Sequence, residues 1–105
     1  KGAAAPLFAK WEPIMGVKVG RLFTQHMRTR WGTCNTRSRS IRLNTELVKK
    51  PAECLEYVVV HEMVHLLEAS HNARFKALMG RCMPNWVVYR QMLNRLPVRH
   101  EEWDY

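Results

Sequence analysis

Several features that define whole classes of protein are missing or scarce in this sequence. It has three cysteines in 105 residues, and no two of them form a C-x-x-C pair. An odd number of separated cysteines argues against a disulfide-dense secreted scaffold and against a cysteine zinc knuckle. No apolar run approaches the roughly 18 residues of a membrane span, and the first residues lack the apolar centre of a signal peptide. The sequence therefore predicts a cytoplasmic location and no contact with a membrane.

The sequence also lacks an initiator methionine, since it begins with Lys1. We therefore expect it to be the carboxy-terminal part of a longer chain. Its 105 residues, 47% of them hydrophobic, leave room for one compact domain over residues 1–105. A domain of this size buries roughly 60 to 70% of the surface that its unfolded chain exposes, so it can fold without disulfides.

Acidic residues are scarce in the first half. Residues 1–50 carry eleven lysines and arginines against two glutamates, whereas residues 51–105 carry six against seven acids. The densest stretch is "RTRWGTCNTRSRSIR" at residues 28–42. Such a cluster suits a phosphate-bearing partner, and nucleic acid is therefore one candidate partner. A basic face that only keeps the protein in solution explains the charge equally well.

The sequence of the first half predicts a helix followed by short strands. Residues 3–15 suit a helix that Gly16 would close, with apolar residues on one stripe. Partial alternation over residues 17–27 indicates a strand interrupted near Gly20, and "IRLN" at residues 41–44 alternates again. The segment between them is rich in turn residues. We expect a short antiparallel pair within residues 17–44.

The second half is predicted to be helical. A helical pattern begins at Ala52, and a further helix is expected through "ARFKALMGRCM" at residues 73–83. After Pro84, an apolar stripe at helical spacing is most consistent with core packing, and Pro97 would end that helix. The fold class is therefore α+β: a small antiparallel sheet, a central helix and further carboxy-terminal helices.

The chemistry of the sequence is concentrated in "HEMVHLLEASH" at residues 61–71. His61 and His65 are one helical turn apart, so both imidazoles can bind one ion. Glu62 lies about 100° around the helix, beside the ion and not on it. This is the H-E-x-x-H arrangement, in which the histidines hold zinc and the glutamate acts as general base on water. The alternative is an amphipathic helix whose histidines are only structural.

A third metal ligand is expected, and His71 is the candidate. On a straight helix His61 and His71 would be about 15 Å apart, too far to share an ion. The helix must therefore end between Leu67 and Ser70, and Ser70 or Asn72 can cap the next one.

Other residues are weaker candidates for the same site. Glu68 is a rival metal ligand, but its carboxylate is better explained as one that orients a histidine or stabilises the structure. Trp31 and Arg42 are candidates for contact with substrate, although packing explains Trp31 better. A metal-binding or nucleophilic role for Cys34 has little support. Four further residues are open candidates for stabilising an oxyanion: His26, Tyr57, Tyr89 and His100.

The ligand spacing resembles that of the metzincin metallopeptidases, but Glu68 stands where they have a turn glycine. A closer resemblance covers nearly the whole chain. "RWGTCNTRSRSIRLNTEL", "YVVVHEMVHLLEASHNARFKALM" and "HEEW" resemble the YgjP-like metallopeptidase family, which is related to SprT-like and other zincin domains. Threonine replaces serine in its W-G-S-C motif, here residues 31–34. The resemblance implies a minimal zincin in which His61, His65 and His71 hold zinc and Glu62 is the general base.

The leading functional prediction is a zinc-dependent peptidase, with "SIRLN" at residues 40–44 as the edge strand that aligns an extended peptide. An attribution carried by the same family suggests nucleoside triphosphate (UTP) pyrophosphatase activity, although histidines suit zinc better than the Mg²⁺ usual in such chemistry. A nucleic-acid-associated protease-like protein and a purely structural zinc site are the remaining alternatives.

Overall fold

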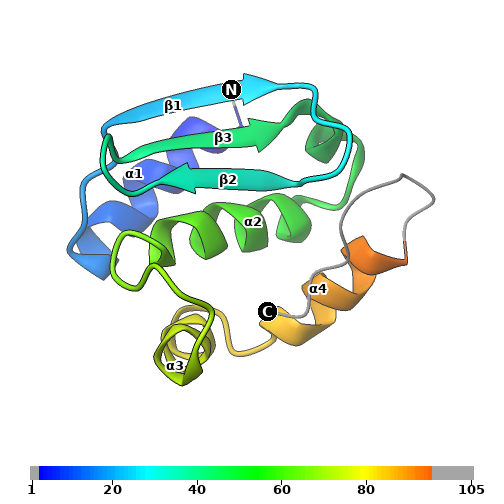
Figure 1. Ribbon diagram of the computed structural model, residues 1–105. Helices are drawn as coiled ribbons and strands as arrows, with labels where there is room; N and C mark the ends of the chain where they lie inside the picture. The colour runs from blue at the N-terminus through cyan, green and yellow to red at the C-terminus, as the bar shows by residue number, and fades with distance from the viewer. Residues whose placement is uncertain (1–2, 96–105) are drawn as a thin grey trace.

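A three-stranded sheet lies against one side of a group of helices (Figure 1). The structure is a computed structural model and describes residues 3–95. Its elements in chain order are α1 (Ala4–Met15), β1 (Arg21–Gln25), β2 (Gly32–Asn35), β3 (Ser40–Asn44), the 3-10 helix η1 (Thr45–Lys49), α2 (Ala52–Val64), α3 (Ala73–Cys82) and α4 (Trp86–Asn94). No helix of this described part is both long and apolar enough to cross a membrane.

The sheet is mixed, with strand order β1-β3-β2. β2 and β3 pair antiparallel, but β1 runs parallel to β3, so the prediction that the strand in residues 17–27 pairs antiparallel with residues 41–44 is wrong, as is that of a wholly antiparallel sheet. The sequence prediction missed β2, which lies in the stretch that appeared to contain only turns. The side chain of Asn35 closes the β2–β3 turn by accepting hydrogen bonds from two backbone N–H groups. Because β2 takes one side of β3, β1 must take the other, and "SIRLN" becomes the central strand.

The first predicted helix is confirmed, including its end. Gly16 has φ +69° and caps α1, a conformation that glycine adopts without strain. Trp11 and Phe8 are buried on the inner face of α1. The indole N–H of Trp11 donates a 2.8 Å hydrogen bond to Glu56 of α2, and Lys10 donates to the same carboxylate oxygen. Apolar packing and a charged hydrogen bond therefore both fix α1 on α2.

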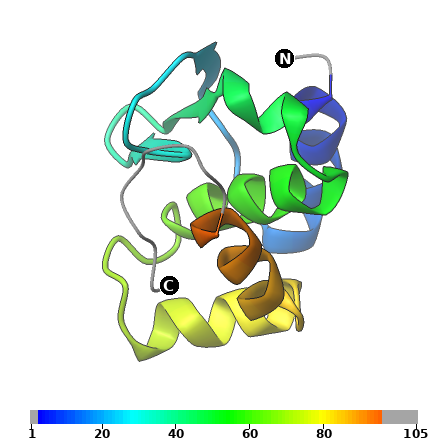
Figure 2. The ribbon, with the colours of Figure 1, turned by 90° about the vertical axis from the view of Figure 1, so that its right-hand side faces the viewer.

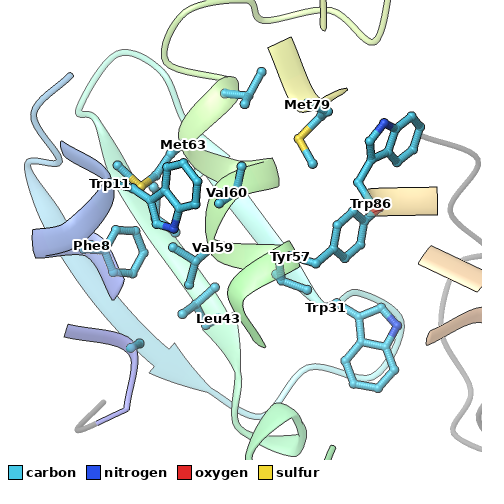
Figure 3. Packing of buried hydrophobic residues seen from close by; sticks show 14 of the residues in the cluster. Phe8, Trp11, Trp31, Leu43, Tyr57, Val59, Val60, Met63, Met79 and Trp86 are labelled. Atoms are coloured by element: carbon cyan, nitrogen blue, oxygen red, sulfur yellow. The ribbon is translucent and has the colours of Figure 1, made fainter. Parts of the chain in front are cut away.

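The central element is α2. It contacts α1, α3, α4, η1, β2 and β3. The sheet lies on one side of it, and α3 and α4 lie on the other (Figures 1 and 2). The buried residues of the helices and the sheet form a single cluster around it (Figure 3). Because neighbours surround α2, even its polar residues His61 and Glu62 are only 2% exposed.

Candidate metal centre

The two histidines of the H-E-x-x-H motif lie one turn apart at the end of α2. Their ring centroids are 5.2 Å apart. His61 is buried, whereas His65 caps the helix and is partly exposed. Burial is the largest influence on His65 and lowers its pKa. A lowered pKa favours the neutral imidazole, which is the form that binds a metal ion.

The regular helix ends earlier than predicted, at Val64 instead of between Leu67 and Ser70. The backbone then tightens, because the N–H groups of Leu66 and Leu67 bond to carbonyls three residues back. The N–H of Glu68 still reaches the carbonyl of Val64 at 2.9 Å. The chain can therefore leave the helix axis without the turn glycine of the metzincins.

Glu68 holds this reversal together. Its carboxylate accepts hydrogen bonds from the backbone N–H of Ser70 and from the guanidinium of Arg74, each at 3.2 Å. Arg74 also donates to the carbonyl of Leu67 at 2.9 Å. The bond from Ser70 and then that from Arg74 lower the pKa of Glu68, which keeps it ionised. These contacts fit a structural carboxylate, one of the three roles that the sequence suggested for this residue.

The next helix begins directly after the reversal and returns His71 to the other histidines. Asn72, one of the two predicted caps, accepts a 3.0 Å hydrogen bond from the backbone N–H of Phe75 and starts α3. The ring centroid of His71 lies 5.5 Å from that of His61 and 4.5 Å from that of His65. The structure thus brings together the three histidines that were predicted to share an ion.

The donor atoms fit a small divalent cation. One nitrogen from each of the three histidines lies within 4.8 Å of the other two. Nδ1 of His65 lies 3.1 Å from the carbonyl oxygen of Ala69, to which it donates when protonated, so that Nε2 keeps its lone pair. That Nε2 lies 2.9 Å from Nε2 of His71. Tetrahedral ligands at about 2.0–2.1 Å from zinc would lie roughly 3.4 Å apart, so only small adjustments are needed.

A phenylalanine that the sequence analysis did not single out packs against all three histidines. The ring of Phe75 is fully buried, and its centroid lies 5.0, 4.8 and 4.9 Å from those of His61, His65 and His71. Phe75 follows His71 by four positions, but His71 precedes the cap of α3, so helical spacing gave no signal for this contact. Phe75 therefore gives the three imidazoles one shared apolar surface to pack against.

Glu62 lies between the histidines and strand β2. Its Oε2 atom is 3.3 Å from Nδ1 of His61. A Cβ atom built on Gly32 would lie 3.0 Å from the same oxygen and 2.9 Å from the side chain of Val58. The glycine of the W-G-T-C motif therefore makes room for this carboxylate, and β2 can approach α2 closely.

The three histidines and Glu62 open into one cavity of about 320 Å³. Its remaining lining comes from β2, from residues flanking β2, and from the loop after α2: Arg30, Gly32, Thr33, Cys34, Thr36 and Ala69. Burial first, and the charge of Glu62 second, raise the pKa of Cys34 to about 11. A thiol with this pKa stays protonated at neutral pH, so Cys34 is a poor nucleophile.

Other sequence candidates lie elsewhere. Trp31 is fully buried in the core, and Arg42 points to a different hollow, where its guanidinium bonds to Gln25. Arg42 is remote because its strand neighbours Ile41 and Leu43 face the core, so its own side chain faces the opposite side of the sheet.

The candidates for oxyanion stabilisation also lie in different parts of the structure. Tyr57 is buried beside His61, with ring centroids 6.0 Å apart, whereas Tyr89 lines another hollow with Lys10 and Trp11. His26 is exposed after β1 and does not line the cavity, and residue 100 lies outside the described residues.

Comparisons with known proteins agree with this geometry. Two solved structures share the fold. The metallopeptidase zymogen of Pyrococcus abyssi abylysin matches with TM-score 0.81 and 15% identity, over 92% of this chain and 97% of that chain. The metallopeptidase zymogen of Methanocaldococcus jannaschii jannalysin matches with TM-score 0.65 and 17% identity, over 85% of this chain and 95% of that chain. Curated protein sequences give no significant match. The YgjP-like, metallopeptidase domain family matches residues 3–96. The chain therefore belongs to the YgjP-like family of metallopeptidase domains and is a metal-dependent hydrolase.

Proposed function

We propose that the protein is a zinc-dependent peptidase that uses His61, His65 and His71 as metal ligands and Glu62 as general base. The observation that carries this proposal is the opening of all four side chains into one cavity. Zinc, when bound, makes a water molecule more acidic and polarises a substrate carbonyl. Three protein ligands leave a coordination position open, which is typical of catalytic zinc sites and not of structural ones.

Glu62 moves the proton in this proposal. Its carboxylate takes the proton of the attacking water and returns it to the nitrogen of the departing amine. Burial of the carboxylate between His61 and β2 keeps it in one position, so little reorganisation is needed before reaction. Phe75 gives the imidazoles an apolar surface to pack against during the same step.

The substrate we propose is an extended peptide paired with β2. This strand lies at the edge of the described sheet and contributes Gly32, Thr33 and Cys34 to the cavity wall. An extended chain that adds to such an edge is held by main-chain hydrogen bonds. β2 therefore takes the role that the sequence analysis gave to "SIRLN", because the latter is paired on both sides.

A nucleoside triphosphate fits the cavity less well than a peptide. Arg30 is the single lysine or arginine among the residues that line it. Enzymes that act on triphosphates commonly use Mg²⁺ with oxygen ligands, whereas this donor set is three imidazoles. UTP should therefore be hydrolysed more slowly than peptides in parallel assays of the zinc-loaded protein.

The proposal is tested with Glu62→Gln and His71→Ala, and with Glu53→Gln, an exposed glutamate in the first turn of the same helix, as the matched control. Wild-type protein, Glu62→Gln and Glu53→Gln should bind one equivalent of zinc by plasma mass spectrometry, and His71→Ala should bind clearly less. Glu62→Gln should lose peptide hydrolysis by roughly 10²- to 10⁴-fold, while Glu53→Gln keeps it. Full activity of Glu62→Gln would disprove the mechanism.

A further inference from the structure

The sheet has a second face that the helices leave uncovered. α1 and α2 lie on one side of it, and no described helix covers the opposite side (Figure 1). On β3, Ile41 and Leu43 face the helices and are buried, so Arg42 faces the uncovered side. Phe23 is the register partner of Arg42 on β1. An aromatic ring and a guanidinium therefore lie next to each other on the uncovered face.

The charge around this face has one sign. Between Glu12 and Glu46 the sequence contains no aspartate or glutamate, and this segment includes all three strands and their connections. The same segment carries seven basic residues: Lys18, Arg21, Arg28, Arg30, Arg37, Arg39 and Arg42. A partner that approaches the strands therefore meets a positive field that attracts anions.

Arg42 is already oriented for a planar ligand. Its guanidinium carbon lies 4.6 Å from the ring centroid of Phe23, and its Nη1 donates a 3.0 Å hydrogen bond to the side-chain oxygen of Gln25. Both of these partners are uncharged, so they fix the guanidinium plane and leave its charge uncompensated. A preoriented arginine loses less conformational entropy when it binds a ligand than a mobile one does.

The face is hollowed where these residues meet. A cavity of about 500 Å³ is lined by arginines, an aromatic ring and small polar residues: Gly20, Arg21, Phe23, Asn35, Ser38, Ser40 and Arg42. None of these residues lines the metal cavity, and β2 contributes different residues to the two hollows. The uncovered face is thus a site distinct from the hydrolytic centre.

We propose that this uncovered face of the sheet binds single-stranded nucleic acid. The arginines suit phosphates, and the guanidinium plane of Arg42 and the ring of Phe23 suit unstacked bases. A duplex would keep its bases out of reach of this hollow. An acidic peptide would satisfy the charge but would make no use of a stacking platform.

The test measures the fluorescence anisotropy of a labelled oligothymidylate with the full chain over a series of salt concentrations. Arg21→Gln/Arg42→Gln is compared with Lys76→Gln/Arg81→Gln, which removes the same charge from exposed positions of α3. Wild-type protein should bind at low salt, and the Arg21/Arg42 variant should bind about tenfold or more weakly. Loss of two phosphate contacts should also make the slope of log K against log salt shallower by roughly 1.4.

Phe23→Ala separates base contact from simple charge attraction, and it should weaken binding about fivefold or more at constant charge. Metal content, peptide hydrolysis and circular dichroism of all these variants should match the wild type, because their side chains lie outside the metal cavity. No binding by wild-type protein at low salt, or equal loss in the two double variants, would overturn the proposal. Unchanged affinity of Phe23→Ala would reduce the face to a general polyanion surface and would overturn it equally.

Discussion

Replacement of Gly32 by alanine tests how closely β2 must approach α2. The added Cβ atom would lie 2.9 Å from Cγ1 of Val58, 3.0 Å from Oε2 of Glu62 and 3.1 Å from Cγ of Glu62. All of these atoms belong to buried side chains of one helix. Val58 does not line the metal cavity and cannot turn away into solvent, so the strand must move or the carboxylate of Glu62 must shift within the cavity.

The size of the effect follows from this overlap. Overpacking of a buried site by a methyl group costs typically about 1–3 kcal/mol. A loss of about 2 kcal/mol lowers Tm by roughly 8–16 °C in a domain of this size. The carboxylate of Glu62 is one of the groups that must shift, so hydrolysis should fall by a larger factor than the unfolded fraction explains. None of the three atoms nearest to the new Cβ belongs to a histidine, so zinc binding should persist.

Gly80→Ala is the matched control for this change. Gly80 lies inside α3, where a new Cβ atom would meet only Nε1 of Trp86, at 3.9 Å. Alanine is favoured over glycine in a helix by roughly 0.5–1 kcal/mol, so this variant should be slightly more stable than wild type and fully active. The assays are thermal unfolding, zinc content and peptide hydrolysis at a temperature where every variant is folded. Wild-type Tm and wild-type activity in Gly32→Ala would refute the close-approach argument.

Two further predictions concern the elements that support the site. Asn72→Ala removes the cap of α3 and should cost about 1 kcal/mol in urea unfolding, with weaker zinc binding because His71 precedes the cap. Burial raises the pKa of Glu56, but hydrogen bonds from Lys10 and Trp11 outweigh this and lower it overall. The folded pKa is therefore below the unfolded one, so the stabilisation is present at neutral pH and is lost as the pH falls through the folded value. Glu56→Gln should accordingly destabilise the protein by about 1–3 kcal/mol at pH 7 and by less in urea unfolding at an acidic pH.

The metal-binding helix could be predicted well because its signal is local. A spacing of four residues places His61 and His65 on one face of any helix, whatever surrounds it. The length of a straight helix then required a reversal before His71. The place of the reversal was not predictable in the same way. It depends on hydrogen bonds from Arg74 to Leu67 and Glu68, which join residues six and seven positions apart without any repeating pattern.

The strand pairing was harder to predict because it depends on which strands become neighbours. β2 has only four residues, begins with a glycine and ends in a turn residue, so its composition is that of a loop. Alternation along β3 was visible, and it placed Arg42 opposite to Ile41 and Leu43. Only the packing of the sheet on α2 shows that Arg42 does not line the metal cavity.

The two sequence motifs of the chain form one structural unit, and Gly32 is where they meet. H-E-x-x-H by itself places metal ligands and a carboxylate on α2, but it does not determine what stands opposite that carboxylate. The absence of a side chain at Gly32 lets β2 lie directly against Glu62, and the next residues of the strand, Thr33 and Cys34, then line the same cavity. A peptide paired with the edge of β2 would therefore lie beside the carboxylate that we propose as the base. A larger residue at position 32 would leave the three histidines in place but would displace the general base from the substrate, so metal binding depends on the histidines alone and catalysis depends on both motifs.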